Sequence, residues 1–220
     1  MRLLRTTSTD PELVYVANEN KTPKYAILLH VWGDKEVTFQ KDMKGWSKVV
    51  GACKLARRKD WEYIWIDTCC IDKSSSSELS EAINSMYRYY RKSKVCYAYL
   101  SDMQSDCLGQ SFNLMFWMCK WFTRGWTLQE LIAPTRVFFF TNDWVKIGMK
   151  ASLQETITEI TGIPSLFLLG ADPTCHSSIA ARMSWAAGRE TTHVEDRAYS
   201  LMGVFGVHMP PLYGKGEHAF

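Results

Sequence analysis

The chain has 220 residues, of which 46% are hydrophobic and 22% are charged, close to the averages of globular proteins. These values exclude a disordered or fibrous chain, and the length fits one large domain. The formal net charge of +3 is too small to argue for a nucleic-acid-binding protein. Aromatic residues make up 13% of the chain and include nine tryptophans, which indicates an aromatic core or a stacking surface.

Four short apolar runs predict buried strands. They are continuously apolar instead of alternating with polar residues, so we expect both faces of the sheet to be covered, as in parallel sheets. The runs are residues 24–31, 63–67, 95–100 and 136–141.

Helical spacing of apolar residues fills the intervals between these strands. The helices lie around residues 46–53, 79–90 and 112–132, the last interrupted near Gly125. Ser75 and Glu78 have the spacing of a capping box before the second helix. The alternation of strands and helices predicts an α/β fold, with a parallel sheet flanked by helices.

We expect one domain with three parts, because no linker interrupts the chain. Residues 1–23 are an N-terminal extension and residues 24–141 are the α/β core. Residues 142–220 are a helical C-terminal part, with helices around 153–160, 177–188 and 193–204.

No segment has the features of a secretory signal or of the ~20-residue apolar helix that a bilayer requires. The seven cysteines form no C-x-x-C motif, although Cys69 and Cys70 are adjacent. Reduced, mostly buried thiols explain this pattern better than disulfides or a zinc site. We therefore expect a cytoplasmic protein that uses no metal.

Polar residues directly follow the first two predicted strands. In an open parallel sheet, ligands bind outside the carboxyl ends of the strands. Taken singly, an Asp after a strand is often a turn former or a helix cap, but the cluster predicts a binding site. Its candidate residues are His30, Trp32, Gly33, Asp34, Asp67 and Asp72.

Two further kinds of chemistry are compatible with this edge. Cys69 or Cys70 with His30 would make a thiol nucleophile and its base, although adjacent cysteines after a buried strand are more often packing residues. Asp34, Asp67 and Asp72 around Mg²⁺ would suit a nuclease-like or nucleoside-hydrolysing enzyme. No phosphate-binding loop or dinucleotide-binding fingerprint is present.

Four ordered blocks resemble the signature blocks of the fungal heterokaryon-incompatibility (HET) domain, over nearly the whole chain. One departure is Leu29, where the family usually has Ser. The blocks are Y-A-I-L-L-H-V-W-G-D at 25–34, Y-I-W-I-D-T-C-C-I-D-K at 63–73, R-G-W-T-L-Q-E-L at 124–131, and a set within 182–214 that includes R-E-T-T at 189–192 and E-D-R-A-Y at 195–199.

The resemblance implies a cell-death effector of fungal non-self recognition. HET domains are often the N-terminal part of larger receptors that carry a nucleotide-binding switch and a repeat sensor, and the end of this chain is compatible with a fragment of one. HET domains have also been compared with TIR domains. The implied fold is a flavodoxin/TIR-like parallel sheet with additional C-terminal helices, and self-association is expected.

Several TIR domains hydrolyse NAD⁺ with a Glu in a W-C-x-x-E pattern. Trp126 and Glu130 have this spacing, although Thr127 replaces the Cys. On a helix the two would share one face, where the indole could stack on the nicotinamide cation and the carboxylate could stabilise an oxocarbenium ion. The resemblance therefore implies Glu130 as the catalytic residue of an NAD⁺ glycohydrolase.

In this interpretation NAD⁺ is the substrate and no cofactor is needed. Asp67 and Asp72 would hold ribose hydroxyls or position Glu130, and His30, Trp32, Gly33, Asp34 and Trp126 would line the nucleotide pocket. In the alternative, Trp126 is a core residue and Glu130 pairs with Arg124 or Arg136. The domain would then be a non-enzymatic module that signals through homotypic interaction, without nucleic acid or membrane as partner.

Overall fold

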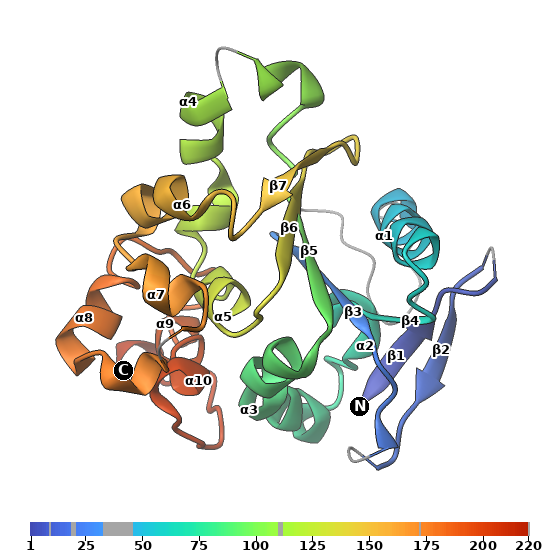
Figure 1. Cartoon of the computed structure of the whole chain (residues 1–220). Helices are drawn as coiled ribbons and strands as arrows, with labels where there is room; N and C mark the ends of the chain where they lie inside the picture. The colour runs from blue at the N-terminus through green and yellow to red at the C-terminus, as the bar shows by residue number, and fades with distance from the viewer. Residues whose placement is uncertain (9, 19–20, 33–45, 110–111, 172, 220) are drawn as a thin grey trace.

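A seven-stranded sheet forms the centre of the molecule, with strand order β2-β1-β4-β3-β5-β6-β7 (Figure 1). The structure is a computed structural model that describes residues 1–220 except 9, 19–20, 33–45, 110–111, 172 and 220. The strands are β1 (Arg2–Arg5), β2 (Glu12–Tyr15), β3 (Ala26–His30), β4 (Tyr63–Trp65), β5 (Val95–Tyr99), β6 (Val137–Phe140) and β7 (Lys146–Met149).

Four parallel strands in the order β4-β3-β5-β6 form the middle of the sheet. They coincide with the four apolar runs, and every residue of β3 is buried. Numbered along the chain, their order is second, first, third and fourth, which is the flavodoxin-like arrangement. The predicted α/β fold is thus confirmed. The second strand is shorter than predicted, because Asp67 already begins a helix.

The sequence did not predict the three antiparallel strands at the edges of the sheet. β1 pairs with β4 and with β2, and β7 pairs with β6. The expected N-terminal extension therefore continues the sheet, and the C-terminal part contains a strand as well as helices. Each of these strands has four residues, too few for an alternating pattern to stand out.

The predicted helices are present, several of them as shorter segments, and the interruption that the sequence predicted near Gly125 is confirmed. The predicted helix at 112–132 is divided into α4, a 3₁₀ turn and α5. The helices are α1 (Trp46–Arg58), α2 (Asp67–Cys70), α3 (Ser76–Lys92), α4 (Phe112–Trp117), α5 (Thr127–Ile132), α6 (Gln154–Thr161), α7 (Ser165–Leu168), α8 (Ile179–Ser184), α9 (Asp196–Tyr199) and α10 (Met202–Phe205), with 3₁₀ turns at Ser105–Leu108, Lys120–Thr123, Thr174–His176 and Gly216–Ala219.

Figure 1 shows α1 to the right of β5 and β6, whereas α5 and α6–α10 gather to the left. α5 packs against β3, α3 and α7, and α10 packs against α3. The contact with α10 is very close: a Cβ atom added to Gly203 would lie 2.3 Å from Cβ of Tyr87 and 2.8 Å from Oε1 of Gln129. The C-terminal helices are therefore fixed against α3 and α5.

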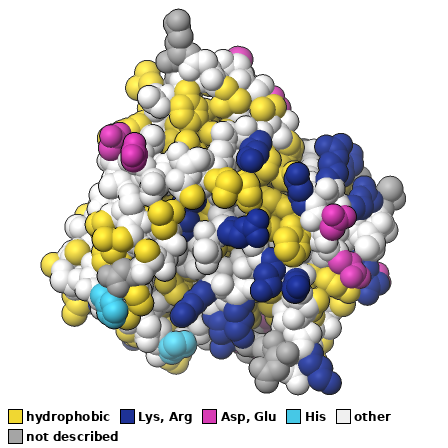
Figure 2. Space-filling model, viewed as in Figure 1, with side chains coloured by type: hydrophobic (Ala, Val, Ile, Leu, Met, Phe, Trp, Pro, Cys, Tyr) yellow, Lys and Arg dark blue, Asp and Glu magenta, His cyan; other side chains and the backbone are white. Residues whose placement is uncertain are grey.

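The face seen in Figure 2 carries many Lys and Arg side chains across its centre and over the position of α3 in Figure 1. α3 itself ends in two cations, since Arg91 and Lys92 lie in its last turn. Cations are favourable there because the helix dipole places partial negative charge at the C-terminus.

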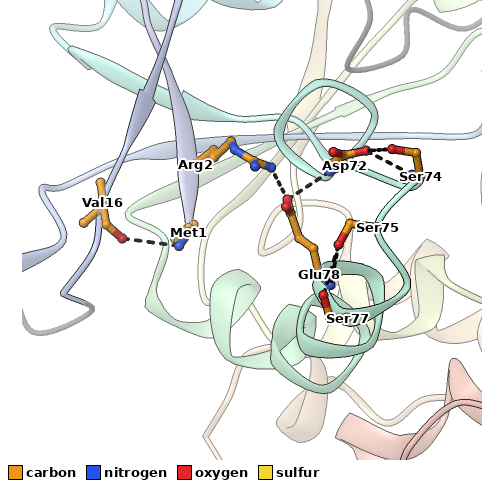
Figure 3. Close-up of polar contacts among 8 residues, drawn as sticks. All are labelled: Met1, Arg2, Val16, Asp72, Ser74, Ser75, Ser77 and Glu78. Carbon is orange, nitrogen blue, oxygen red and sulfur yellow. Dashed lines mark hydrogen bonds and ion pairs between the residues drawn. The ribbon is translucent and has the colours of Figure 1, made fainter.

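A polar cluster joins the N-terminal hairpin to the start of α3 (Figure 3). Arg2 on β1 forms an ion pair with Glu78, whose Oε1 also accepts a hydrogen bond from the Asp72 backbone at 2.9 Å. The Ser75 hydroxyl accepts from the Glu78 backbone at 3.4 Å, so the predicted cap is present. The Glu78 side chain contacts Arg2 and Asp72, whereas in a complete capping box it would return to Ser75.

Two further observations concern the described part of the chain. None of its helices has the length and apolar character that crossing a bilayer requires. All seven cysteines are free thiols, and five of them are buried.

Candidate functional site

A cavity of about 550 Å³ lies at the carboxyl ends of β3 and β4, within the size range of ligand pockets. Its lining comes from the ends of both strands, from α3, from the segment that leads into α5, and from the C-terminal part. The lining residues are His30, Val31, Trp32, Asp67, Ile71, Lys73, Leu79, Ile83, Met86, Arg124, Trp126, Thr127, Glu130, Thr192, His193, Glu195, Asp196, Tyr213 and Gly214.

The Glu130 carboxyl on α5 faces this cavity and is almost fully buried, with 6% of the residue exposed. Trp121 Nε1 donates a hydrogen bond to its Oε2 at 3.2 Å. Burial, and then the negative charge of Asp67, raise the pKa of Glu130 well above its ordinary value. Trp121, Arg189 and Tyr90 act in the opposite direction.

The alternative ion pair for Glu130 does not form. Among the residues that the structure describes, no Lys or Arg nitrogen lies within ion-pair distance of its carboxyl. Arg124 instead donates to Thr192 Oγ1 at 2.8 Å. Glu130 is thus a buried acid held by neutral donors, and a cationic ligand in the cavity would favour its ionised form.

Three predicted residues from the ends of β3 and β4 meet at the Asp67 carboxylate. Trp32 Nε1 donates to Asp67 Oδ2 at 2.7 Å, and His30 Nε2 lies 3.9 Å from Oδ1. Trp32 is half exposed, and the ammonium of Lys73 lies 3.1 Å from the centre of its ring, which is a close cation–π contact. The indole is therefore fixed by both an acceptor and a cation.

Trp126, which directly precedes α5, lies next to the Asp196 carboxyl. That carboxyl accepts a hydrogen bond from the Tyr213 hydroxyl at 2.9 Å. Burial raises the pKa of Asp196. Trp126 and Glu130 both line the cavity, on the shared face that their spacing predicted.

The remaining predicted residues lie elsewhere. Gly33 and Asp34 are outside the described residues. Asp72 is not part of the lining: its Oδ1 accepts from the Ser74 backbone at 3.0 Å and from the Ser74 hydroxyl at 2.6 Å (Figure 3). Asp72 thus forms the turn before α3, the common role of an Asp after a strand, and does not hold a ligand in this cavity.

The structure gives little support to the other chemistries. Cys70 is buried, and burial raises the pKa of its thiol well above the ordinary value, whereas a nucleophile needs a thiolate. In the described part of the chain, no three His, Cys, Asp or Glu side chains are arranged to hold a metal ion.

Sequence reasoning assigned no role to several residues that hold the site together. Lys73, Arg189 and Asp196 belong to the blocks that resemble the HET domain. The neighbours of Arg189 and Asp196 depend on how residues 182–214 fold back, whereas Lys73 contacts Trp32. Trp121 precedes the third block and carries no motif of its own.

Two comparisons with known proteins bear on the family of the chain. The family described as "Heterokaryon incompatibility protein (HET)" matches residues 25–117, which include β3, α2, α3 and β5. Vegetative incompatibility protein HET-E-1 of Podospora anserina is 48% identical over 210 residues, or 90% of this chain. These matches identify a heterokaryon-incompatibility (HET) domain in the chain.

This HET chain spans 15% of the length of HET-E-1, so most of that relative has no counterpart here. No solved structure matches the HET chain significantly. Glu130, Trp126 and the C-terminal residues of the cavity all lie beyond the stretch that the family match covers.

Proposed function

We propose that this HET domain is a cell-death effector in fungal heterokaryon incompatibility and that it hydrolyses NAD⁺ to nicotinamide and ADP-ribose. The incompatibility role is supported by the 48% identity to a protein named for vegetative incompatibility. The hydrolytic role rests on the site.

One observation carries the hydrolase proposal: the buried Glu130 carboxyl shares a cavity of about 550 Å³ with two indoles and three further acidic residues, among them Asp67. Trp32 and Trp126 provide aromatic surface for a cationic ring, and Asp67 provides an acceptor for ribose hydroxyls. The C-terminal residues close one side and limit the access of water to a charged intermediate.

The proposed reaction follows from these groups. The bond between the nicotinamide nitrogen and ribose C1′ breaks, and its electron pair leaves with nicotinamide. The ionised Glu130 stabilises the oxocarbenium ion, and one water adds to C1′ and releases one proton. The positive charge of the substrate offsets the burial that raises the pKa of Glu130, so binding itself favours the ionised carboxylate.

Self-association is part of the proposal, since a sensor elsewhere in a longer receptor would bring several HET domains together. We expect hydrolysis at high protein concentration or after fusion to a tetramerising segment, and little in dilute monomer. NAD⁺ and further copies of the chain are thus the proposed partners.

The test compares nicotinamide release by the wild type, Glu130→Gln and Glu159→Gln, each incubated with NAD⁺ in the tetrameric form. Glu159 lies exposed on α6, away from the cavity, and provides the matched control. We expect Glu130→Gln to lose at least ~100-fold in rate, because a neutral amide cannot stabilise the cation, and Glu159→Gln to match the wild type.

Two outcomes would contradict the hydrolase proposal: no release by the tetrameric wild type, or equal release by Glu130→Gln. If cell death in the fungus also survived Glu130→Gln, the domain would be a signalling module that acts through binding alone.

A further inference from the structure

A second cavity, of about 420 Å³, lies behind the segment that leads into α5. Gly125 contributes to its lining, whereas Arg124 and Thr127 line the first cavity, so residues 124–127 separate the two. The rest of the lining comes from residues 183–201 and contains one methionine, one leucine, two alanines and three hydroxyl groups. It has two arginines, Arg189 and Arg197, and no carboxylate.

Arg189 is held firmly but is not fully satisfied. Its Nη1 donates to the Arg124 carbonyl at 3.0 Å and to Thr127 Oγ1 at 2.8 Å, and its Nε donates to the Trp185 carbonyl at 3.2 Å. The remaining nitrogen, Nη2, is buried and has no acceptor within the described residues. A buried donor without an acceptor typically costs about 1–3 kcal/mol, so an acceptor supplied by a ligand would be favourable.

The guanidinium remains a cation despite this burial. Desolvation lowers the pKa of Arg189 to about 10, and the charge of Glu130 acts against that decrease. At neutral pH the cavity therefore contains a positive charge whose hydrogen-bonding capacity is incomplete.

Arg197 adds a second cation from α9. Its side chain is exposed and makes no hydrogen bond or ion pair with any residue in the described ranges. A guanidinium presents donors in a planar fork that matches the two oxygens of a phosphate or carboxylate. Arg197 therefore has exposed donors to spare at a partly apolar cavity that Arg189 also lines.

We propose that this second cavity binds the phosphate or carboxylate group of a small organic anion through Arg189 and Arg197. The apolar side chains at 183, 186, 187 and 201 would contact the organic part of the ligand. The proposal does not depend on hydrolysis in the first cavity, because binding here needs neither Glu130 nor NAD⁺.

The test is a calorimetric titration without NAD⁺, at about 0.15 M salt, where long-range attraction between exposed charges is largely screened. The probes are phenyl phosphate, benzoate and, as the neutral counterpart, phenol. We expect saturable binding of phenyl phosphate or benzoate at one site and none of phenol, and the two anions distinguish a phosphate from a carboxylate site.

Arg197→Gln should weaken this binding at least 10-fold, which corresponds to about 1.4 kcal/mol. Arg197 is suitable because it makes no contact that the fold needs, whereas loss of Arg189 would leave Arg124, Thr127 and Trp185 without their donor. Arg91→Gln is the control, because it removes one exposed charge from the last turn of α3 without touching the cavity.

If neither phenyl phosphate nor benzoate bound saturably, the proposal would be overturned. Equal weakening by Arg91→Gln and Arg197→Gln would also overturn it, since binding would then reflect only the overall positive surface.

Discussion

At the scale of single residues, tryptophan N–H groups organise the carboxylates of the candidate site. Trp32 donates to Asp67 and Trp121 donates to Glu130, whereas Trp126 lies next to Asp196. An indole is a donor only, so each pair orients the acid without adding a positive charge. The acids therefore keep their response to a positively charged group in the cavity, and at Glu130 this arrangement costs stability.

We predict that Glu130→Gln stabilises the folded chain at neutral pH. The folded-state pKa of Glu130 is raised above its ordinary value of 4.5, so the folded state binds more protons and stability falls as the pH rises above about 4.5. Gln cannot ionise and keeps an oxygen that can accept from Trp121. The Tm of the variant should exceed that of the wild type at pH 7, with about 2–4 °C for each kcal/mol gained, and should approach it at pH 4.

Thermal unfolding at the two pH values checks this, with Glu159→Gln as the matched exposed substitution. A Tm difference that is the same at pH 4 and pH 7 would show that Glu130 does not titrate between them.

At the scale of elements, the close contact between α10 and α3 holds the C-terminal part in place. Gly203 lies so near Tyr87 and Gln129 that no side chain fits between them. α3 supplies Ile83 to the cavity and α5 supplies Glu130, so a displacement of α10 would shift the side chains that line the site.

Gly203→Ala should therefore destabilise the chain by about 1–3 kcal/mol, because the added methyl group must displace Tyr87. Gly188→Ala is the matched control: a Cβ at Gly188 would meet no described atom within 4 Å, and the change should stay within about 0.5 kcal/mol. Chemical denaturation measures both, and equal stabilities for the two variants would mean that α10 moves freely.

An element could be predicted from the sequence where a short-range sequence pattern determines it. β3, α1 and the Ser75 cap follow from short-range patterns, and the meeting of His30 with Asp67 follows from the rule for parallel strand ends. The three edge strands did not follow, because four residues give no clear period. The roles of Asp196 and Arg189 could not be predicted either, since they depend on short C-terminal helices packed against distant segments.

At the scale of the whole molecule, strand β1 near the N-terminus is part of the core. Leu3 and Leu4 of β1 are buried in the main hydrophobic cluster, and Arg2 reaches Glu78 at the start of α3. The hairpin of β1 and β2 therefore stabilises the side of the sheet on which β4 leads to Asp67.

Leu3→Ala should cost about 2–5 kcal/mol, because it leaves a cavity beside β4. That loss corresponds to a fall of roughly 5 °C or more in Tm for a chain of this size. Leu13→Ala on β2, where the side chain is 36% exposed, should cost less than about 1 kcal/mol. Equal Tm values for the two variants would show that the hairpin is not part of the core.

The cavity around Glu130 is assembled from both halves of the sequence. The residues that the family match covers supply His30, Trp32, Asp67 and the side of α3, whereas Glu130, Trp126 and Asp196 come later. A protein that shared only the residues of the family match would have Asp67 at a shallow surface open to water, without the buried Glu130 carboxyl. During synthesis, too, this cavity is incomplete until the segment that carries Glu195, Asp196 and Tyr213 has docked against α3 and α5.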